Sequence, residues 1–318
     1  MLWHGMGDSA AGMIGIANIL EDNIPGVYVH RIMIGGNLLT DTESGFFRDT
    51  NRQIREVCEM IAEDAELAGG YNAIGFSQGG QFLRAVAQRC PSPPMKNLIT
   101  FGAQHQGVFG FPQCPGEMNF FCDIVRDLLN YGAYVDFVQD ILVQAQYWHD
   151  PLHFDTYVEK SKFIAEINNE KAVKNESYAV NLATLENFVL VKHNQDGMVE
   201  PRESEHFEFY TPGQSDVILP LRESPIYVED RIGLKALDES GRLHFLDVEV
   251  KTFPFLSFAT FTRSVFIATF WTQKNGRISK VNTANESNCC ICLCFRSVHM
   301  CSIDLCFLTP AEDQLAIQ

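Results

Sequence analysis

Short apolar runs alternate with amphipathic stretches in the first third of the chain. Three runs have the length and the residue types of buried strands: 26–35, 71–75 and 97–103. Two stretches between them carry apolar residues at helical spacing: 51–68 and 78–90. Strands that alternate with helices predict a mostly parallel sheet flanked by helices, so we expect an α/β fold.

The pattern changes twice further along the chain. Helical periodicity replaces the strands after the third run, and we interpret about 111–185 as a helical insertion. The sheet is expected to resume at 187–192 and again near 243–246. Beyond that point the composition changes, so we predict a domain over 1–249 and an atypical tail over 250–318.

The tail has two features whose simplest interpretations the sequence disfavours. Residues 253–271 are roughly long enough to cross a bilayer. However, Arg263 near their centre costs about 2.5 to 3.5 kcal/mol on insertion, which disfavours a membrane helix. The cysteines between Cys289 and Cys306 lack the paired C-x-x-C spacing of a zinc site, so no metal is expected there.

Composition places the chain among folded globular proteins and disfavours one class of partner. The sequence has 318 residues, of which 46% are hydrophobic and 20% are charged, and this is enough for a sizeable core. The 40 acidic and 24 basic residues give a net charge of -16. That charge repels phosphate backbones, so we expect no nucleic-acid partner.

Cysteine usage and the first residues bear on the cellular compartment. Cys58, Cys90, Cys114 and Cys122 lie in the predicted domain, and their even number permits two disulfides or four buried thiols. The count alone leaves both alternatives open. The opening residues show no charged stretch followed by an apolar one, so the printed sequence contains no signal peptide and we expect its start to be shortened.

One motif predicts nucleophilic catalysis. Gly75-Phe76-Ser77-Gln78-Gly79 fits G-x-S-x-G, with a predicted strand before it and a predicted helix after it. This arrangement is typical of a nucleophile elbow, in which a strained turn lifts a serine hydroxyl clear of the sheet and small neighbours let strand and helix approach. We therefore predict that Ser77 is a nucleophile, the alternative being an ordinary turn that contains serine.

Two backbone amides are candidates for stabilising an oxyanion. Gln78 supplies the N–H just after the predicted nucleophile, at a helix N-terminus. The loop His4-Gly5-Met6-Gly7-Asp8 follows Met1-Leu2-Trp3, which we interpret as the stub of a strand. It offers the Met6 amide as the second donor, unless its glycines serve folding alone. We interpret His4 as a structural histidine bonded within this loop, because this fold orders its triad as serine, acid, histidine.

The acid of the triad is expected at the end of a later strand. Asp196, in the loop after 187–192, is the best candidate, with Glu200 as the alternative. No histidine fits the expected loop beyond a final strand. The candidates downstream of Asp196 are His206, His244 and His299.

Several long motifs resemble those of the palmitoyl-protein thioesterases, lysosomal α/β-hydrolases that remove fatty acyl groups from cysteine. The resemblance covers about residues 2–249. The segments that carry it are Trp3-His4-Gly5-Met6-Gly7-Asp8-Ser9, 70–73, 75–85, 102–107, Gln146-Tyr147-Trp148-His149-Asp150-Pro151 and Asp230-Arg231-Ile232-Gly233-Leu234-Lys235.

The resemblance implies an α/β-hydrolase fold and a set of site residues. It implies Ser77 as nucleophile, Asp196 as triad acid, Met6 and Gln78 as oxyanion amides, and the helical insertion as an acyl-binding groove. It pairs Cys58 with Cys90 and Cys114 with Cys122, and makes Asn175-Glu176-Ser177 a glycosylation acceptor. The implied partners are S-acylated proteins and acyl thioesters, with no cofactor and no metal. The implied location is the lysosome or secretory pathway.

The chain departs from the family in three places. The family's signal peptide and first strand are missing, Ala10-Ala11 stand where related chains have adjacent cysteines, and residues after about Glu249 do not match. The family's catalytic histidine belongs to a Gly-Asp-His turn that this sequence does not contain. We therefore expect the chain as printed to have impaired activity. We interpret its ends as those of an alternative transcript or a flawed gene model. The alternatives are a non-catalytic acyl-binding or interaction protein and a related lipase or carboxylesterase.

Overall fold

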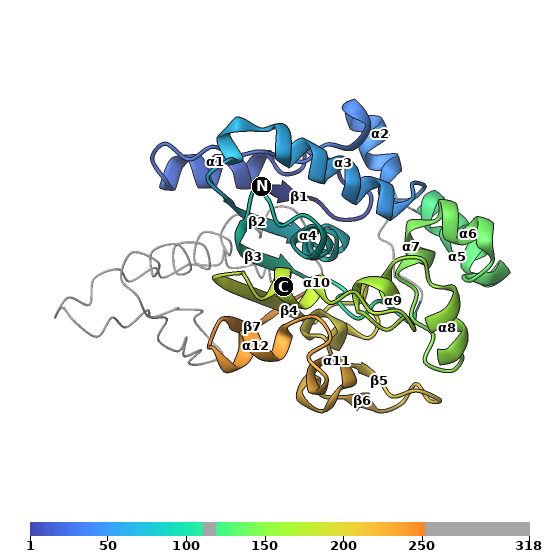
Figure 1. Ribbon diagram of the computed structural model, residues 1–318. Helices are drawn as coiled ribbons and strands as arrows, with labels where there is room; N and C mark the ends of the chain where they lie inside the picture. Colours follow the sequence, from blue (N-terminus) through green and yellow to red (C-terminus); the bar gives the residue numbers. More distant parts are fainter. Residues whose placement is uncertain (111–118, 252–318) are drawn as a thin grey trace, which may run out of the picture. The chain divides into compact units, whose positions relative to one another are not determined.

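A parallel sheet surrounded by helices forms the part of the chain that the structure describes. The computed structural model describes residues 1–110 and 119–251, which belong to a unit of Met1–Phe253. Five strands run through the middle of this unit, with α1 to α3 on the side of β1 and α12 beside β7 (Figure 1). The predicted α/β class is confirmed.

The five strands are all parallel, in the order β1-β2-β3-β4-β7. Their bounds are β1 Leu2–Trp3, β2 Tyr71–Phe76, β3 Met95–Phe101, β4 Asn187–Gln195 and β7 Leu243–Lys251. The register aligns Trp3 with Gly75, and Phe76 with Phe101, so the strands end at a common edge. Open parallel sheets bind their ligands outside this carboxyl edge. A separate antiparallel pair joins β5 Phe209–Tyr210 to β6 Ile218–Leu219.

The helices of the described residues lie in the connections between the strands. Those before β3 are α1 Ile14–Asn23, α2 Leu38–Ser44, α3 Thr50–Glu63 and α4 Gln78–Arg89. Those between β3 and β4 are α5 Asn119–Gly132, α6 Asp136–Ile141, α7 Val143–Gln146, α8 Phe154–Lys160, α9 Ile164–Ile167 and α10 Ser177–Leu182. The last are α11 Pro225–Val228 and α12 Leu234–Glu239, and the 3₁₀ turns are η1 Ile34–Gly36, η2 Ala65–Leu67, η4 Arg202–His206 and η5 Leu221–Glu223.

The segment 26–35 does not form the strand that its apolar residues predict. A single isolated bridge pairs Arg31 with Leu2. Because β1 is only two residues long, its edge is too short to pair with more of the segment 26–35. Gly35 and Gly36, at φ 78° and 80°, then turn the chain away.

A disulfide ties α3 to the end of α4. Cys58 and Cys90 are joined, with their Cα atoms 5.9 Å apart, which is the pairing that the family resemblance implies. The second implied pair, Cys114 with Cys122, lies outside the described residues because residue 114 and the side chain of residue 122 are not described. The bridge fixes the helix that follows the predicted nucleophile.

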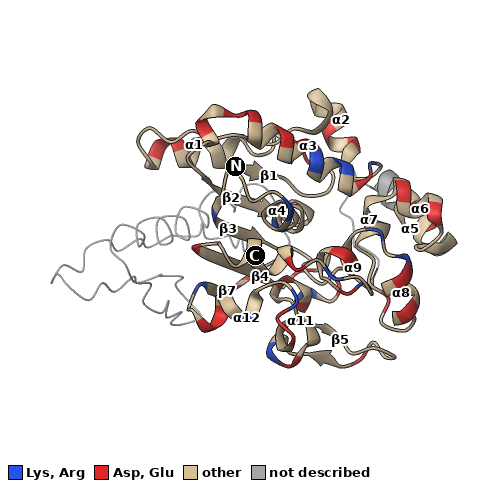
Figure 2. Cartoon of the chain, viewed as in Figure 1, with Lys and Arg blue, Asp and Glu red and all other residues tan. Residues whose placement is uncertain are grey.

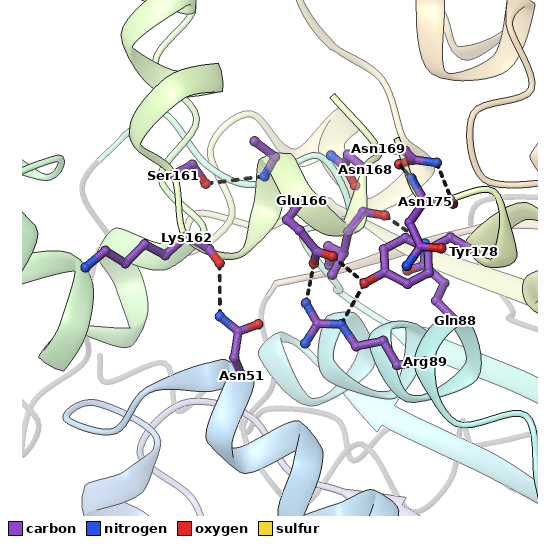
Figure 3. Close-up of polar contacts among 12 residues, drawn as sticks. Asn51, Gln88, Arg89, Ser161, Lys162, Glu166, Asn168, Asn169, Asn175 and Tyr178 are labelled. Atoms are coloured by element: carbon purple, nitrogen blue, oxygen red, sulfur yellow. Dashed lines mark hydrogen bonds and ion pairs between the residues drawn. The ribbon is translucent and has the colours of Figure 1, made fainter. Parts of the chain in front are cut away.

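Ring packing and a polar network connect the sheet to the helices between β3 and β4. The ring of Phe82 on α4 lies edge-on to Trp3 and to Phe163, with centroid separations of 5.3 and 5.7 Å. At the end of α4, Arg89 pairs with Glu166, and its Nε donates to the Tyr178 hydroxyl at 3.1 Å (Figure 3). The two contacts anchor α9 and α10 to the helix that follows the G-x-S-x-G turn.

Acidic side chains recur along α1, α3, α6 and α8 (Figure 2). Within 1–110 and 119–251, no helix combines the length and apolar character that crossing a membrane requires. The apolar stretch 253–271 and the cysteine-rich segment, both discussed above from sequence, lie outside the described residues.

Candidate active site

Ser77 occupies a strained turn between β2 and α4. Its backbone has φ 51° and ψ −125°, a region that costs a non-glycine residue of order 1 to 3 kcal/mol and persists where surrounding structure enforces it. The neighbouring glycines explain how it is enforced. A Cβ at Gly75 would lie 2.3 Å from Gly80 Cα, and one at Gly79 would lie 2.3 Å from the His4 carbonyl oxygen. Side chains at these positions would separate strand from helix, so the geometry of the predicted nucleophile elbow is present.

The Ser77 turn is fixed to the sheet and opens onto a pocket. The Ser77 N–H donates to the Phe101 carbonyl at 2.7 Å, and the Ser77 carbonyl accepts from Gly80 N–H at 3.0 Å. The pocket is mainly apolar, with a few polar groups among its walls. It is lined by Met6, Ser77, Gln104, Val108, Gly110, Leu129, Gln144, Tyr147, Met198 and Val199.

Both predicted oxyanion residues are close to Ser77, Gln78 in sequence and Met6 in the pocket wall. Met6 lines the same pocket, and its backbone N–H has no acceptor within the described part of the chain. Gly5 packs against the serine, since a Cβ there would lie 3.1 Å from Ser77 Cβ. Gln78 begins α4, and its side chain donates to the Gly45 carbonyl at 3.1 Å. This arrangement leaves backbone donors available for an oxygen bound beside Ser77.

Asp196 is buried directly after β4. Its Oδ1 accepts from the N–H groups of Met198 at 2.5 Å and Val199 at 3.2 Å, which fixes the carboxylate in the turn. The alternative acid, Glu200, is exposed and accepts from the Tyr210 hydroxyl at 3.4 Å. Asp196 is therefore buried and fixed whereas Glu200 is exposed, and the assignment of Asp196 as the acid of a triad stays a prediction.

Two buried residues that sequence reasoning missed surround Asp196. His193 belongs to β4, which extends three residues beyond the predicted strand end of 192, and a Cβ at Gly102 would lie 2.9 Å from its Nδ1 and 3.6 Å from Asp196 Oδ2. Glu205, in η4, accepts from the His193 N–H at 2.9 Å. Burial lowers the pKa of His193 to about 4, with Asp196 opposing the shift. Burial, and then repulsion by Asp196, raises the pKa of Glu205 well above its ordinary value.

The same three residues form a group that could hold a metal ion. His193, Asp196 and Glu205 each offer one ligand atom, and these atoms lie within 4.8 Å of one another. A nitrogen with two carboxylate oxygens suits Zn²⁺. However, Asp196 Oδ1 already accepts two amides, and the raised pKa of Glu205 means that a proton can neutralise the carboxyl pair. Part of the donor set is therefore engaged or neutralised without a metal.

Comparison with known proteins identifies the family of this chain. The family model described as "Palmitoyl protein thioesterase" matches residues 1–251. The chain belongs to the palmitoyl-protein thioesterase family.

Curated relatives agree with the family assignment. "Palmitoyl-protein thioesterase 1" of Caenorhabditis elegans is 54% identical over 252 residues, which cover 78% of this chain and 84% of that protein. "Palmitoyl-protein thioesterase 3" of Dictyostelium discoideum is 36% identical over 247 residues, covering 77% and 81%. "Lysosomal thioesterase PPT2" of Rattus norvegicus is 27% identical over 242 residues, covering 76% of each. The family resemblance expected from the sequence motifs is confirmed.

The structure does not bring the predicted alternative histidines of this thioesterase-family chain into the pocket. His206 donates through Nε2 to the Leu190 carbonyl at 3.3 Å. His244 pairs with Val189 near the amino ends of β7 and β4, at the edge opposite Ser77. His299 lies outside the described residues. Among the described residues, no histidine lines the Ser77 pocket.

The buried Glu205 makes a pH-dependent contribution to stability that a neutral replacement should remove. Its folded-state pKa is raised above the ordinary 4.5. Above pH 4.5 the unfolded chain therefore releases a proton from Glu205 that the native state retains. Because of this difference, the free energy of unfolding of wild type falls by up to about 1.4 kcal/mol for each unit by which the pH rises. In urea unfolding, we expect the free energy of unfolding of Glu205→Gln to equal that of wild type at pH 4.5 and to be larger than that of wild type at pH 7.5.

Glu223→Gln is the matched control for this measurement, because Glu223 is exposed. Its unfolding curves should follow wild type at both pH values. Equal pH dependence for Glu205→Gln and wild type would contradict the protonated, buried state of Glu205.

Proposed function

We propose that this protein hydrolyses long-chain acyl thioesters of cysteine in proteins and peptides, with Ser77 as the nucleophile. The observation that carries the proposal is the strained Ser77 turn, whose residue lines one pocket together with Met6. Membership of the palmitoyl-protein thioesterase family supports the choice of substrate.

The proposed chemistry assigns a role to each predicted residue. The Ser77 Oγ attacks the thioester carbonyl carbon, and the negative charge that develops on the carbonyl oxygen is stabilised by the Met6 and Gln78 N–H groups. The carbon–sulfur bond then breaks, and the cysteine leaves as a thiol that carries the proton lost from the Ser77 hydroxyl. Water cleaves the resulting acyl ester of Ser77 and restores the hydroxyl. Asp196 is the residue that would orient an imidazole base.

We assign the acyl chain to the apolar walls of the Ser77 pocket. Leu129 of α5, Val108 after β3 and Val199 after Asp196 contribute to these walls. Hydrocarbon recognition requires such surfaces, whereas the few polar groups near the serine fix orientation. The helices between β3 and β4 thus supply part of the proposed acyl-binding groove.

A pair of peptides tests this function. The two peptides have the same sequence and carry palmitate on cysteine in one case and on serine in the other. We expect release of palmitate from the cysteine thioester and much slower release from the serine ester. Equal rates would indicate a general carboxylesterase, and retention of both peptides without any turnover would indicate a non-catalytic acyl-binding protein, which the lack of a pocket histidine in the described residues favours.

We propose the lysosome, reached through the secretory pathway, as the location of this protein. The Cys58–Cys90 disulfide supports passage through an oxidising compartment. One relative is itself named a lysosomal thioesterase. The second disulfide, between Cys114 and Cys122, remains a prediction of the family resemblance.

Asn175 is expected to carry an N-linked glycan when the protein is secreted. It is exposed, and its Oδ1 accepts from the Ser177 N–H at 3.1 Å and O–H at 2.7 Å. Peptide mass mapping with and without glycosidase should show the glycan on the peptide that contains Asn175. Ser177→Ala should remove it from that peptide, and an unmodified wild-type peptide would contradict the assignment.

A further inference from the structure

His4, at the start of the oxyanion loop, makes two hydrogen bonds, one through each ring nitrogen. The side chain is 3% exposed. Its Nδ1 lies 3.0 Å from the Gly5 carbonyl oxygen, and its Nε2 lies 3.1 Å from Asp41 Oδ1. A carbonyl oxygen can only accept. The Nδ1 atom therefore carries a proton, and the state of Nε2 depends on Asp41.

Asp41 acts as an acceptor toward every neighbour that it contacts in the described structure. Its Oδ2 accepts from the Ala10 N–H at 2.8 Å, and its Oδ1 accepts from the Ile34 N–H at 2.7 Å. The side chain has no exposed surface, so these donors and His4 replace its solvent. A carboxylate that receives backbone N–H groups is stabilised in its ionised form. Nε2 of His4 must then donate as well, which makes the ring an imidazolium.

The clamped ring is directly connected to the Ser77 turn through the backbone. The carbonyl oxygen of His4 packs closely against Gly79, since a Cβ added at Gly79 would lie only 2.3 Å from this oxygen. The next residue, Gly5, packs against Ser77, and Met6 follows it in the pocket wall. A shift of His4 therefore moves the Met6 amide relative to Ser77, and sub-ångström shifts matter for an oxyanion donor.

We propose that His4 is a positioning residue: its imidazolium, held between the Gly5 carbonyl and Asp41, fixes the Met6 N–H for the oxyanion, and deprotonation releases it. The proposal rests on the proposed roles of Ser77 and Met6. It goes beyond them because it assigns a charged state to a buried histidine and makes the oxyanion loop sensitive to pH.

Electrostatics determine the direction of that sensitivity. Burial opposes the charge, but the hydrogen bond and attraction to Asp41, the Gly5 carbonyl and the charge of Asp8 outweigh it and raise the pKa of His4 above 6.5. The imidazolium is therefore retained in acidic and near-neutral solution. As the pH rises through the raised pKa, the His4 ring loses its charge and the oxyanion loop is held less firmly. We therefore expect the proposed activity to be higher in an acidic compartment.

The protonation state can be measured in the full chain without any turnover. We expect ¹⁵N NMR of histidine-labelled protein to show both nitrogens of His4 protonated at pH 6.5, and the Met6 amide signal to move when His4 titrates. His4→Gln identifies the ring signal. A neutral His4 at pH 6.5, or a Met6 amide indifferent to the titration, would overturn the proposal.

Covalent labelling of Ser77 by a fluorophosphonate tests the consequence for reactivity. His4→Gln should lower the maximal labelling rate constant about tenfold or more, with little change in the probe concentration that gives half-maximal rate. Asp41→Asn should move the basic limb of the rate profile to lower pH, a change that a general folding defect would not produce. The matched control is His30→Gln, because His30 is bonded to Asp64 at 3.1 Å in a comparable pair away from the pocket.

The outcomes separate this proposal from the proposed function. Equal rates and equal pH profiles in wild type, His4→Gln and Asp41→Asn would refute the positioning role while leaving Ser77 as the nucleophile. Absence of labelling at Ser77 in wild type would refute the proposed nucleophile, and the NMR titration would still decide the state of His4 and its effect on Met6.

Discussion

In a version of the chain that carries the family's Gly-Asp-His segment, Ser77→Ala is expected to abolish fluorophosphonate labelling and palmitate release while the folded structure persists. Alanine retains the Cβ and the strained φ of 51°, and it removes only the oxygen that would bond to the acyl carbon. Without that oxygen no acyl-enzyme can form, and residual catalysis relies on binding and oxyanion stabilisation alone. The measurements are labelling followed by peptide mapping, and the initial rate on a palmitoyl-cysteine peptide.

Ser240→Ala provides the comparison for this experiment. Ser240 donates through its hydroxyl to the Ala236 carbonyl at 2.7 Å near the end of α12, far along the chain from the G-x-S-x-G turn. We expect Ser240→Ala to react with the fluorophosphonate and to release palmitate at the same rates as the version with Ser77 and Ser240 unchanged. Near-normal palmitate release by Ser77→Ala would show that another group is the nucleophile.

Supplying an imidazole is expected to raise the rate about 10³-fold or more. The family resemblance places the catalytic histidine in a Gly-Asp-His turn after the last strand, and the printed sequence has no such turn. In the sheet, Lys251 of β7 pairs with Gln195, the residue before Asp196. A histidine just beyond β7 would therefore enter beside the proposed acid and relieve Ser77 of attacking as a neutral alcohol.

The experiment replaces the residues that follow β7 with the family's Gly-Asp-His segment and measures hydrolysis of a palmitoyl thioester beside the unaltered chain. A third version with Gly-Asp-Asn controls for any gain in folding. We expect activity to increase with the histidine alone. Equal rates of hydrolysis by all three versions would contradict this prediction. The remaining candidates for the base would then be His206, His244, His299 and His193.

The sequence predicted the elements whose local signals are strong. Gly75 to Gly79 identified the elbow because close backbone contact excludes side chains there. Helical periodicity placed α4 within one residue of its observed bounds. It also placed the start of α3, but α3 ends at Glu63 rather than at 68. The strand predicted over 26–35 was wrong because apolar residues cannot reveal that the neighbouring strand is two residues long. Strand pairing is a non-local property, and local pattern does not determine it.

The surroundings of the predicted acid were the least visible part of the site. Glu205 lies in η4 and reaches the His193 backbone across 12 residues, and no motif spacing marks that contact. His193 was overlooked because the triad order directed attention downstream of Asp196. Asp41 was missed for a similar reason, since its contact with His4 spans 37 residues. In each case the fold, rather than a short motif, brings the polar groups together.

The backbone contacts around the elbow have a consequence for inherited variation. A single added methyl group at Gly75 or Gly79 would be placed 2.3 Å from main-chain atoms, which cannot rotate aside as a side chain can. Substitutions there should therefore be ranked by volume, with alanine already severe, although alanine is the mildest change on most chemical scales. Nucleotide changes that convert these glycine codons would thus act as loss-of-function alleles, whatever the charge or polarity of the new residue.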